Sequence, residues 1–246
     1  MDNRVIIDAF PENGLVYRDT HAIVVIDVIR ATTTAVTAVN LGRRVFPVKT
    51  TDEAFVLSQT LENPLLVGEL GGNVPYGFDL PNSPVQMTAL STINAGQFTD
   101  PHRPIILLSS SGTQLMKNSI GSEAVYLACF RNISAVAAHL IGRHSTIAVI
   151  GAGTRGRFRR EDQICCARVT EKLLDAGYAM EDARTKEIVS RWSGTSPESA
   201  RGGQSEDYLK RSGQLFDLEF ILSHIDDIDM VPILVDGELV KVSQNS

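Results

Sequence analysis

Apolar stretches of five to seven residues, rich in Val, Ile and Leu, alternate with segments of helical pattern from residue 21 to residue 176. The apolar stretches predict strands at residues 21–27, 44–48, 64–68, 104–109, 123–128 and 146–151. The other segments predict helices at residues 33–41, 51–61, 84–95, 113–118, 133–141 and 161–176. Strands that are apolar throughout and separated by helices are typical of a sheet covered on both faces. The pattern therefore predicts an α/β fold with a largely parallel sheet.

The pattern changes after Gly177. Residues 178–213 are polar, and their many Gly and Ser residues predict a loop or a mobile excursion between short helices. Residues 218–240 predict a helix, an acidic turn and a final strand. Because no Pro- or Ser-rich linker divides the chain, we expect a single α/β domain over residues 1–246.

A strand runs into a turn of small residues and then into a helix at three places, at residues 24–36, 105–116 and 147–158. Each turn places amide and hydroxyl groups at the start of a helix, where the helix dipole favours anions. Open α/β sheets bind ligands at the carboxyl ends of their strands. We therefore expect the three turns to meet in one crevice that binds a phosphate-like or multiply charged substrate.

The third turn, "IAVIGAGTRGRFRRED", carries Gly151, Gly153 and Gly156 in the spacing of a dinucleotide fingerprint. That motif requires a second strand ending in an acid about 20 residues later, but Glu171 falls within a predicted helix. A dinucleotide-linked oxidoreductase therefore ranks behind other anion-binding functions. The chain also lacks the Gly-Lys-Ser/Thr of a P-loop. Ile29 stands where an aspartyl-phosphate enzyme would carry its second Asp, so a covalent route is unsupported.

Several polar residues follow the first of these strands. Asp27 ends a buried strand, where a carboxylate requires a cation or hydrogen-bond donors. Arg30 is able to grip a phosphate or carboxylate through two hydrogen bonds, and Thr32, Thr33 and Thr34 supply hydroxyl groups. The alternative interpretation is an Asp27–Arg30 pair beside a capped helix.

Further acids and hydroxyls lie in the other turns. Glu69, Asp79 and Asn82 lie in the long loop 67–86, and hard oxygen ligands of this kind suit Mg²⁺; the alternative is a surface loop with incidental acids. Residues 109–113 offer anion contacts or only a helix cap.

The turns before two later helices carry similar alternatives. Arg131 and Asn132 lie in an equivalent turn, where Asn132 is either a ligand or a helix cap. Glu161 and Asp162 are either a base and a metal ligand, or acids that stabilise the start of a helix.

Composition narrows the function classes. A net charge of −6 argues against a nucleic-acid-binding protein, and no apolar run reaches the 18 residues expected of a membrane span. The first residues lack the features of a signal peptide, and Cys129, Cys165 and Cys166 have no metal-type spacing, which favours packing roles. We expect a cytoplasmic protein without membrane or nucleic-acid partners. A homodimer is a base-rate expectation.

Taken together, these segments resemble the 2-phosphosulfolactate phosphatase family of coenzyme M biosynthesis. The resemblance rests on "DVIRATTT" (27–34), "GELGGNVPYGFDLPNSP" (68–84), "SSSGT" (109–113), "FRN" (130–132), "GAGTRGRFRRED" (151–162) and "SGQLFDLEFILSHIDDIDMVP" (212–232). It implies a three-layer α/β/α fold with a largely parallel or mixed sheet, and Mg²⁺-dependent hydrolysis of 2-phospho-3-sulfolactate to 3-sulfolactate and phosphate.

The resemblance also implies roles for individual residues. Asp27, Glu69 and Asp162 would bind Mg²⁺, and Asp27, Arg30 and Asp162 would be catalytic. The substrate would be held by Thr33, Thr34, Ser111, Gly112, Thr113, Asn132, Gly153 and Arg155. Two positions depart from the family's usual pattern: Ser111 replaces an Asn, and Leu70 replaces a basic residue. These departures leave open a different small anionic phosphoester, or a non-catalytic anion-binding protein on the same fold.

Overall fold

The computed structural model describes residues 3–92, 101–154 and 156–242. Its strands are β1 (Arg4–Ala9), β2 (Ala22–Ile26), β3 (Val45–Val48), β4 (Leu65–Gly68), β5 (Ile105–Leu108), β6 (Val125–Ala128), β7 (Thr146–Gly151), β8 (Ala179–Met180), β9 (Val231–Val235) and β10 (Glu238–Val242). Its α-helices are α1 (Gly14–Tyr17), α2 (Ala31–Asn40), α3 (Thr51–Ser58), α4 (Pro84–Thr92), α5 (Gly112–Asn118), α6 (Ile133–Leu140), α7 (Arg160–Asp175), α8 (Ala183–Trp192), α9 (Gln204–Arg211) and α10 (Leu215–Ser223).

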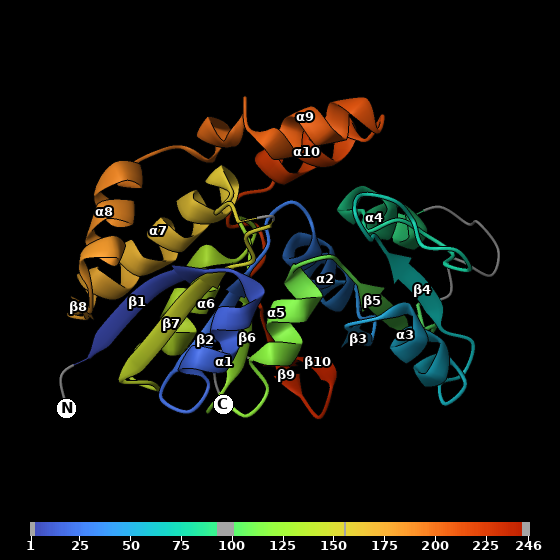
Figure 1. Cartoon of the computed structure of the whole chain (residues 1–246), viewed down its shortest axis with the longest axis horizontal. Coiled ribbons are helices and arrows are strands. Elements are labelled where there is room, and N and C mark those ends of the chain that lie inside the picture. Colours follow the sequence, from blue (N-terminus) through green and yellow to red (C-terminus); the bar gives the residue numbers. More distant parts are fainter. Residues whose placement is uncertain (1–2, 93–100, 155, 243–246) are drawn as a thin grey trace.

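All ten strands belong to one mixed sheet in the order β4-β5-β3-β10-β9-β6-β2-β7-β1-β8 (Figure 1). The outer parts, β4-β5-β3 and β6-β2-β7-β1-β8, are parallel. The hairpin of β9 and β10 lies between them and pairs antiparallel with both β6 and β3. The C-terminal strands therefore join two parallel halves into one mixed sheet.

Helices cover both faces of the sheet because its strands are apolar on both sides. Along β2, Val24 and Ile26 pack into the core under α6, α7 and α8, whereas Ile23 and Val25 pack into the core under α2 and α5. All five residues of β2 are buried. This arrangement confirms the α/β fold class, and the two helical layers give the expected α/β/α sandwich.

The six predicted strands and six predicted helices are present, with ends shifted by up to three residues. The last residues of the predicted helix 84–95 lie outside the described part of the chain. The single final strand was wrong. Asp236 and Gly237 have φ values of 49° and 84°, a combination that makes a tight hairpin turn, so two strands form where one was expected.

The polar segment after Gly177 contains the helices α8 and α9, separated by residues 193–203, which include a short 3₁₀ helix at Pro197–Ala200. Both helices have residues that explain them. The Asp182 side chain accepts a hydrogen bond from the Thr185 amide at the start of α8, and α9 has acids in its first turn and bases in its last. The prediction of short helices in this segment is confirmed. In the described part of the chain, no helix combines the length and apolarity needed to cross a bilayer.

Candidate active site

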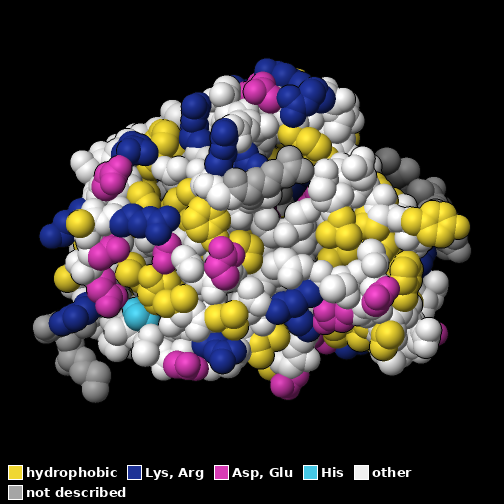
Figure 2. All heavy atoms as spheres, in the orientation of Figure 1, with side chains coloured by type: hydrophobic (Ala, Val, Ile, Leu, Met, Phe, Trp, Pro, Cys, Tyr) yellow, Lys and Arg dark blue, Asp and Glu magenta, His cyan; other side chains and the backbone are white. Residues whose placement is uncertain are grey.

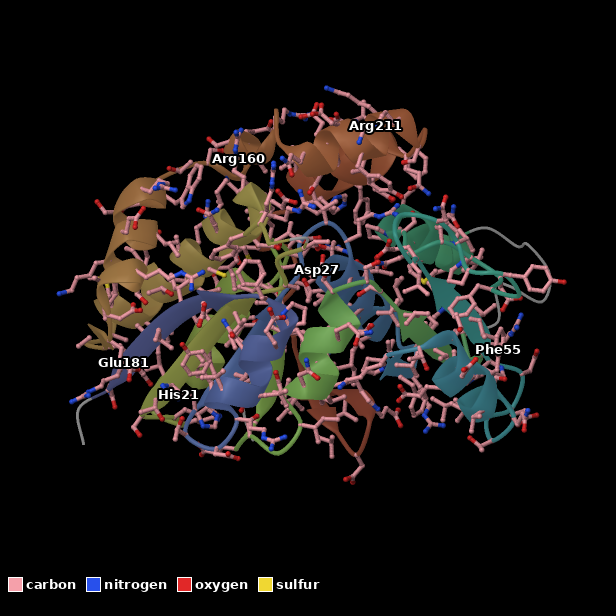
Figure 3. The ribbon with its side chains drawn as sticks, viewed as in Figure 1. His21, Asp27, Phe55, Arg160, Glu181 and Arg211 are labelled. Carbon is pink, nitrogen blue, oxygen red and sulfur yellow. The ribbon has the colours of Figure 1, made fainter. Side chains whose placement is uncertain are left out.

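A pocket of about 470 Å³ opens at the carboxyl ends of β2, β5 and β7, and α9 forms one of its walls. Asp27 of this pocket lies near the middle of the molecule, and Arg211 lies on α9 (Figure 3). It is lined by Asp27, Ile29, Arg30, Glu69, Gly71, Gly72, Asn82, Ser110, Ser111, Ala152, Thr154, Arg159, Asp162, Gln204, Ser205, Asp207, Tyr208 and Arg211. The three strand-to-helix turns singled out in the sequence thus contribute to one crevice, as expected from the topology of open α/β sheets.

Two buried carboxylates, which we call the acidic floor, lie at the base of this pocket: Asp27, directly after β2, and Asp162, in the first turn of α7. The Val28 amide donates a hydrogen bond to Asp162 Oδ1 at 2.9 Å, so the two acids flank the same peptide unit. Thr32 Oγ1 donates to the Asp27 carbonyl at 2.8 Å, and Thr33 Oγ1 donates to the Val28 carbonyl at 2.8 Å. The threonines of "RATTT" thereby fix the backbone that carries the acidic floor.

Burial and mutual repulsion make these acids reluctant to ionise. Burial, followed by the nearby charge of Glu69, raises the pKa of Asp27 from its ordinary value of 3.8 to about 7. Burial, the charge of Glu161 and the charge of Asp27 raise the pKa of Asp162 well above its usual range. A bound cation would relieve this repulsion, which is the electrostatic signature of a functional site.

Gly112, the first residue of α5, lies against Asp27. Its amide donates a hydrogen bond to the Asp27 carboxylate, and the Ala31 amide donates to Asp27 Oδ1 at 3.4 Å. A Cβ atom at Gly112 would lie 2.5 Å from Asp27 Oδ2 and 2.6 Å from Ala31 Cβ. The anion at the start of α5 is therefore the protein's own carboxylate, and only a glycine fits there.

Replacing Gly112 with alanine is accordingly expected to displace the Asp27 carboxylate or α5. We expect turnover to fall by about 100-fold and the protein to lose about 1–3 kcal/mol of stability from the overpacking. Steady-state kinetics and thermal unfolding check both effects. Ser119→Ala, in the turn that follows α5, is the control and should retain turnover. Unchanged kinetics in Gly112→Ala would show that the position of Asp27 does not matter.

Arg30 reaches the pocket from the start of α2 but is already neutralised. Its Nη1 lies 2.5 Å from Oδ2 of Asp217 on α10, and both side chains are at least 97% buried. Ser83 Oγ donates to the other Asp217 oxygen at 2.6 Å. The Asp27–Arg30 pair, which was the alternative interpretation of the sequence, is absent from the hydrogen bonds and ion pairs of the described residues. Arg30 instead ties the pocket to α10 and to the start of α4.

Glu69 holds the loop that follows β4. Its Oε1 accepts a hydrogen bond from the Ser110 amide at 2.9 Å and its Oε2 accepts one from the Gly72 amide at 2.7 Å. The Gly71 amide donates to Ser110 Oγ at 2.8 Å. Glu69 therefore lines the pocket as predicted, but both of its oxygens are already used in joining two loops. Leu70, one of the two family departures, is exposed and is not among the pocket residues.

The structure brings five of the predicted site residues to the pocket lining: Asp27, Arg30, Glu69, Ser111 and Asp162. Ser111 Oγ lies 2.6 Å from Thr154 Oγ1, which joins the second turn to the third. Arg155 lies outside the described residues. The catalytic and binding roles of these residues stay predictions.

Other predicted substrate ligands are placed elsewhere. Thr113 is fully buried, and its hydroxyl donates to the Ser109 carbonyl at 3.0 Å. Thr33 makes the backbone contact described above, and Thr34 is buried away from the pocket lining with no partner for its hydroxyl among the described residues. These hydroxyls satisfy local backbone groups or lie in the interior, as Ser and Thr beside turns often do. The structure therefore gives no support to direct substrate binding by them.

Asn132 and Arg131 serve the fold in the same way. Asn132 Oδ1 accepts from the Cys129 amide at 2.9 Å, and Nδ2 donates to the Met230 carbonyl at 3.2 Å. Arg131 makes two hydrogen bonds to Asp227, of 3.0 and 2.6 Å. The predicted role of Asn132 as a substrate ligand is not supported, because its side chain anchors β9 to the start of α6.

The glycines of the third turn allow close packing. A Cβ atom at Gly153 would lie 2.8 Å from the Arg157 carbonyl and 2.9 Å from the Phe10 ring. Gly153 is not among the pocket residues, so its predicted contact with substrate is also unsupported. Glu171, in the interior of α7, accepts a hydrogen bond from the Gly194 amide at 3.2 Å. The spacing of these glycines is thus explained by close packing, and the Glu171 carboxylate is engaged with the backbone of the turn after α8.

Sequence reasoning missed the wall formed by α9. Asp207, Tyr208 and Arg211 lie three, four and seven residues after Gln204, so the four share one helical face. All four line the pocket. The Tyr208 hydroxyl donates to the Gly72 carbonyl across the pocket, and the Ser205 hydroxyl donates to Glu161. The helical spacing was visible in the sequence, but nothing local indicated that this face meets loops more than 130 residues earlier.

The pocket offers oxygen donors of the kind that a magnesium ion takes from a protein. Asn82 lines the pocket, and its buried Oδ1 has no hydrogen-bond partner among the described residues. Among the same residues, neither Asp27 nor Asp162 forms an ion pair. Within residues 3–92, 101–154 and 156–242, no three His, Cys, Asp or Glu side chains converge into a complete metal site. Mg²⁺ usually takes only one or two carboxylates and completes its shell with water and substrate phosphate, so these residues fit such a site.

Comparison with known proteins adds a direct finding. A family model described as 2-phosphosulpholactate phosphatase matches residues 9–237. A protein of Thermotoga petrophila named probable 2-phosphosulfolactate phosphatase is 35% identical over 218 residues, which cover 88% of this chain and 90% of that protein. A protein of Deinococcus radiodurans with the same name is 32% identical over 240 residues, 96% of this chain and 95% of that protein. One of Carboxydothermus hydrogenoformans, also so named, is 32% identical over 238 residues, 94% and 91% respectively.

Proposed function

The chain belongs to the 2-phosphosulfolactate phosphatase family, and from this premise we propose that it hydrolyses 2-phospho-3-sulfolactate to 3-sulfolactate and phosphate in a Mg²⁺-dependent reaction. The observation that carries the proposal is the acidic floor: Asp27 and Asp162 are buried together at the base of a pocket, with raised pKa values. These carboxylates would attract a divalent cation, and the bound cation would in turn attract the phosphoryl group of the substrate.

Asp27 and Asp162 would hold the cation through their carboxylates, and Asn82 would offer its unpartnered Oδ1 to the same pocket. When bound, the ion neutralises charge on the phosphoryl oxygens. Arg30 would contribute a positive charge whose position is fixed by Asp217. Ser111 and Thr154 would supply hydroxyl groups beside the phosphoryl group.

The chemistry is the attack of water on phosphorus, with cleavage of the bond between phosphorus and the C2 oxygen. That oxygen leaves with a proton as the hydroxyl group of 3-sulfolactate. We assign the attack to water because the Asp27 carboxylate already accepts hydrogen bonds from the Gly112 and Ala31 amides. Those amides stabilise its charge and reduce its nucleophilicity.

Phosphate release from a panel of esters in the presence of Mg²⁺ tests the substrate. We expect the highest kcat/KM for 2-phosphosulfolactate, lower values for 2-phospholactate, which lacks the sulfonate, and the lowest for p-nitrophenyl phosphate. A higher kcat/KM for a different ester would change the assigned substrate but not the assigned reaction class. Tight binding of 2-phosphosulfolactate without phosphate release would contradict the proposal and identify a non-catalytic anion-binding protein.

A further inference from the structure

The arginines near the pocket differ in whether a carboxylate already neutralises them. Arg30 is paired with Asp217, and Arg131 with Asp227. Arg159 and Arg211 also line the pocket, yet within the described part of the chain neither makes an ion pair. We call Arg159 and Arg211 the arginine rim. Arg159 also acts electrostatically on the carboxylates of Glu161 and Asp162, where it opposes the rise of their pKa values, so Arg211 carries the positive charge that is more available to an anionic ligand.

The arginine rim is built into the pocket wall. Arg159 directly precedes α7 and donates a hydrogen bond to the Gln204 side chain of α9. Arg211 is the last residue of α9 (Figure 3). Because α9 is also joined to the opposite wall through Tyr208 and Gly72, the helix that carries Arg211 is held beside the pocket.

Acidic and basic groups are therefore unevenly distributed in the site, although Asp207 of α9 also lines the pocket. Carboxylates occupy the acidic floor, where the metal and the phosphoryl group are proposed to bind. The arginine rim comes from the residue before α7 and from the end of α9, and the surface view shows Lys and Arg side chains over this part of the molecule (Figure 2). A ligand that fits both parts is a phosphoester with a second strongly acidic group some distance from phosphorus.

We propose that the arginine rim, and Arg211 in particular, recognises the non-transferred sulfonate group of the substrate and so determines specificity. This inference rests on the proposed function. Guanidinium groups bind planar pairs of acidic oxygens through two parallel hydrogen bonds, which a lysine cannot reproduce. Arg211 thus acts on binding of the ester, while the acidic floor acts on the reacting phosphoryl group.

The test compares two esters, 2-phosphosulfolactate and 2-phospholactate, which differ only in the sulfonate. In Arg211→Gln we expect kcat/KM for the sulfonated ester to fall about 10- to 100-fold, mainly through KM, as for loss of a charge-assisted hydrogen bond. The value for 2-phospholactate should fall less than about threefold, and Arg211→Lys should lie between wild type and Arg211→Gln. An equal loss on both esters would overturn the inference.

Lys210→Gln is the matched control, because it removes a positive charge from the neighbouring position of α9. Lys210 pairs with Glu206 at 2.8 Å and does not line the pocket, so its variant should keep the wild-type preference. A loss of preference in Lys210→Gln equal to that in Arg211→Gln would overturn the inference, since it would indicate general attraction of anions.

A binding measurement separates this inference from the proposed function. Calorimetry with 3-sulfolactate requires no turnover and uses lactate as the comparison ligand. Wild type is expected to bind 3-sulfolactate at least about 10-fold more tightly than Arg211→Gln does. If wild type hydrolyses no ester but this difference is found, the proposed function fails and the inference stands. Equal affinity in both proteins would overturn the inference even if the enzyme is active.

Discussion

Replacing Asp27 with asparagine is expected to reduce phosphate release by about 10³-fold or more and to stabilise the protein at pH 8 when no divalent cation is present. The loss of activity follows from the place of Asp27 on the acidic floor. The gain in stability follows from the cost of keeping this carboxylate ionised in the folded protein, where its pKa is about 7. Thermal unfolding and steady-state kinetics on the same samples measure both effects.

The pH dependence of stability has a defined sign. Because burial raises the pKa of Asp27 from 3.8 to about 7, the folded state binds more protons than the unfolded state between these two values. The contribution of Asp27 to the free energy of unfolding of the wild-type protein therefore falls as pH rises from about 4 to 7. It is constant above that range. The total corresponds to roughly 4 kcal/mol, and Asp27→Asn should lack this part of the pH dependence.

Asp236→Asn makes the same chemical change in the exposed turn between β9 and β10 and serves as the control. Asparagine tolerates the positive φ at this position, so activity and stability should match wild type. An Asp27→Asn variant that is less stable than wild type at pH 8 without metal would show that the buried charge is compensated in the apo protein.

Removal of Asp217 is expected to have the largest effect on stability. Asp217→Leu leaves the Arg30 guanidinium buried without its carboxylate and removes the acceptor of the Ser83 hydroxyl. Breaking a buried pair in this way costs about 3–5 kcal/mol, which corresponds to a fall in unfolding temperature of roughly 10 °C for a chain of this length. Chemical or thermal denaturation measures it.

Two further variants show whether the unpaired charge is the cause. Arg30→Met combined with Asp217→Leu removes both charges, and we expect it to regain most of the lost stability but little activity, since the pocket has lost a cation. Glu187→Ala breaks an exposed pair with Arg191, whose side chain is 53% accessible, and should change stability by less than about 0.5 kcal/mol. A double variant as unstable as Asp217→Leu would instead indicate that packing, and not the unpaired charge of Arg30, causes the loss of stability.

The residues that could be located from the sequence are those whose place in the pocket follows from their position after a strand. Asp27, Glu69 and Ser111 come directly after buried strands or in the turns that follow them, and parallel strands bring their carboxyl ends to one edge of the sheet. Asp162 is similarly fixed by its place in the first turn of α7. Local pattern and topology together are sufficient for such residues.

The rest of the site depends on contacts that local pattern does not encode. The Arg30–Asp217 pair joins residues 187 positions apart, and the hydrogen bond from Tyr208 to Gly72 spans 136 positions. The sequence also does not indicate whether a polar residue in a turn contacts a ligand or the backbone of the protein. Thr113 and Asn132 resemble ligands in the sequence, yet both satisfy nearby main-chain groups.

The most direct measurement is the rate of phosphate release from 2-phosphosulfolactate by the wild-type protein and by Asp27→Asn, each with Mg²⁺ and with EDTA. We expect turnover only for wild type with Mg²⁺, and its recovery when Mg²⁺ is restored after EDTA. Equal rates for wild type with Mg²⁺ and with EDTA, or full activity in Asp27→Asn, would contradict the assignment of the acidic floor as the site of metal-dependent phosphoester hydrolysis.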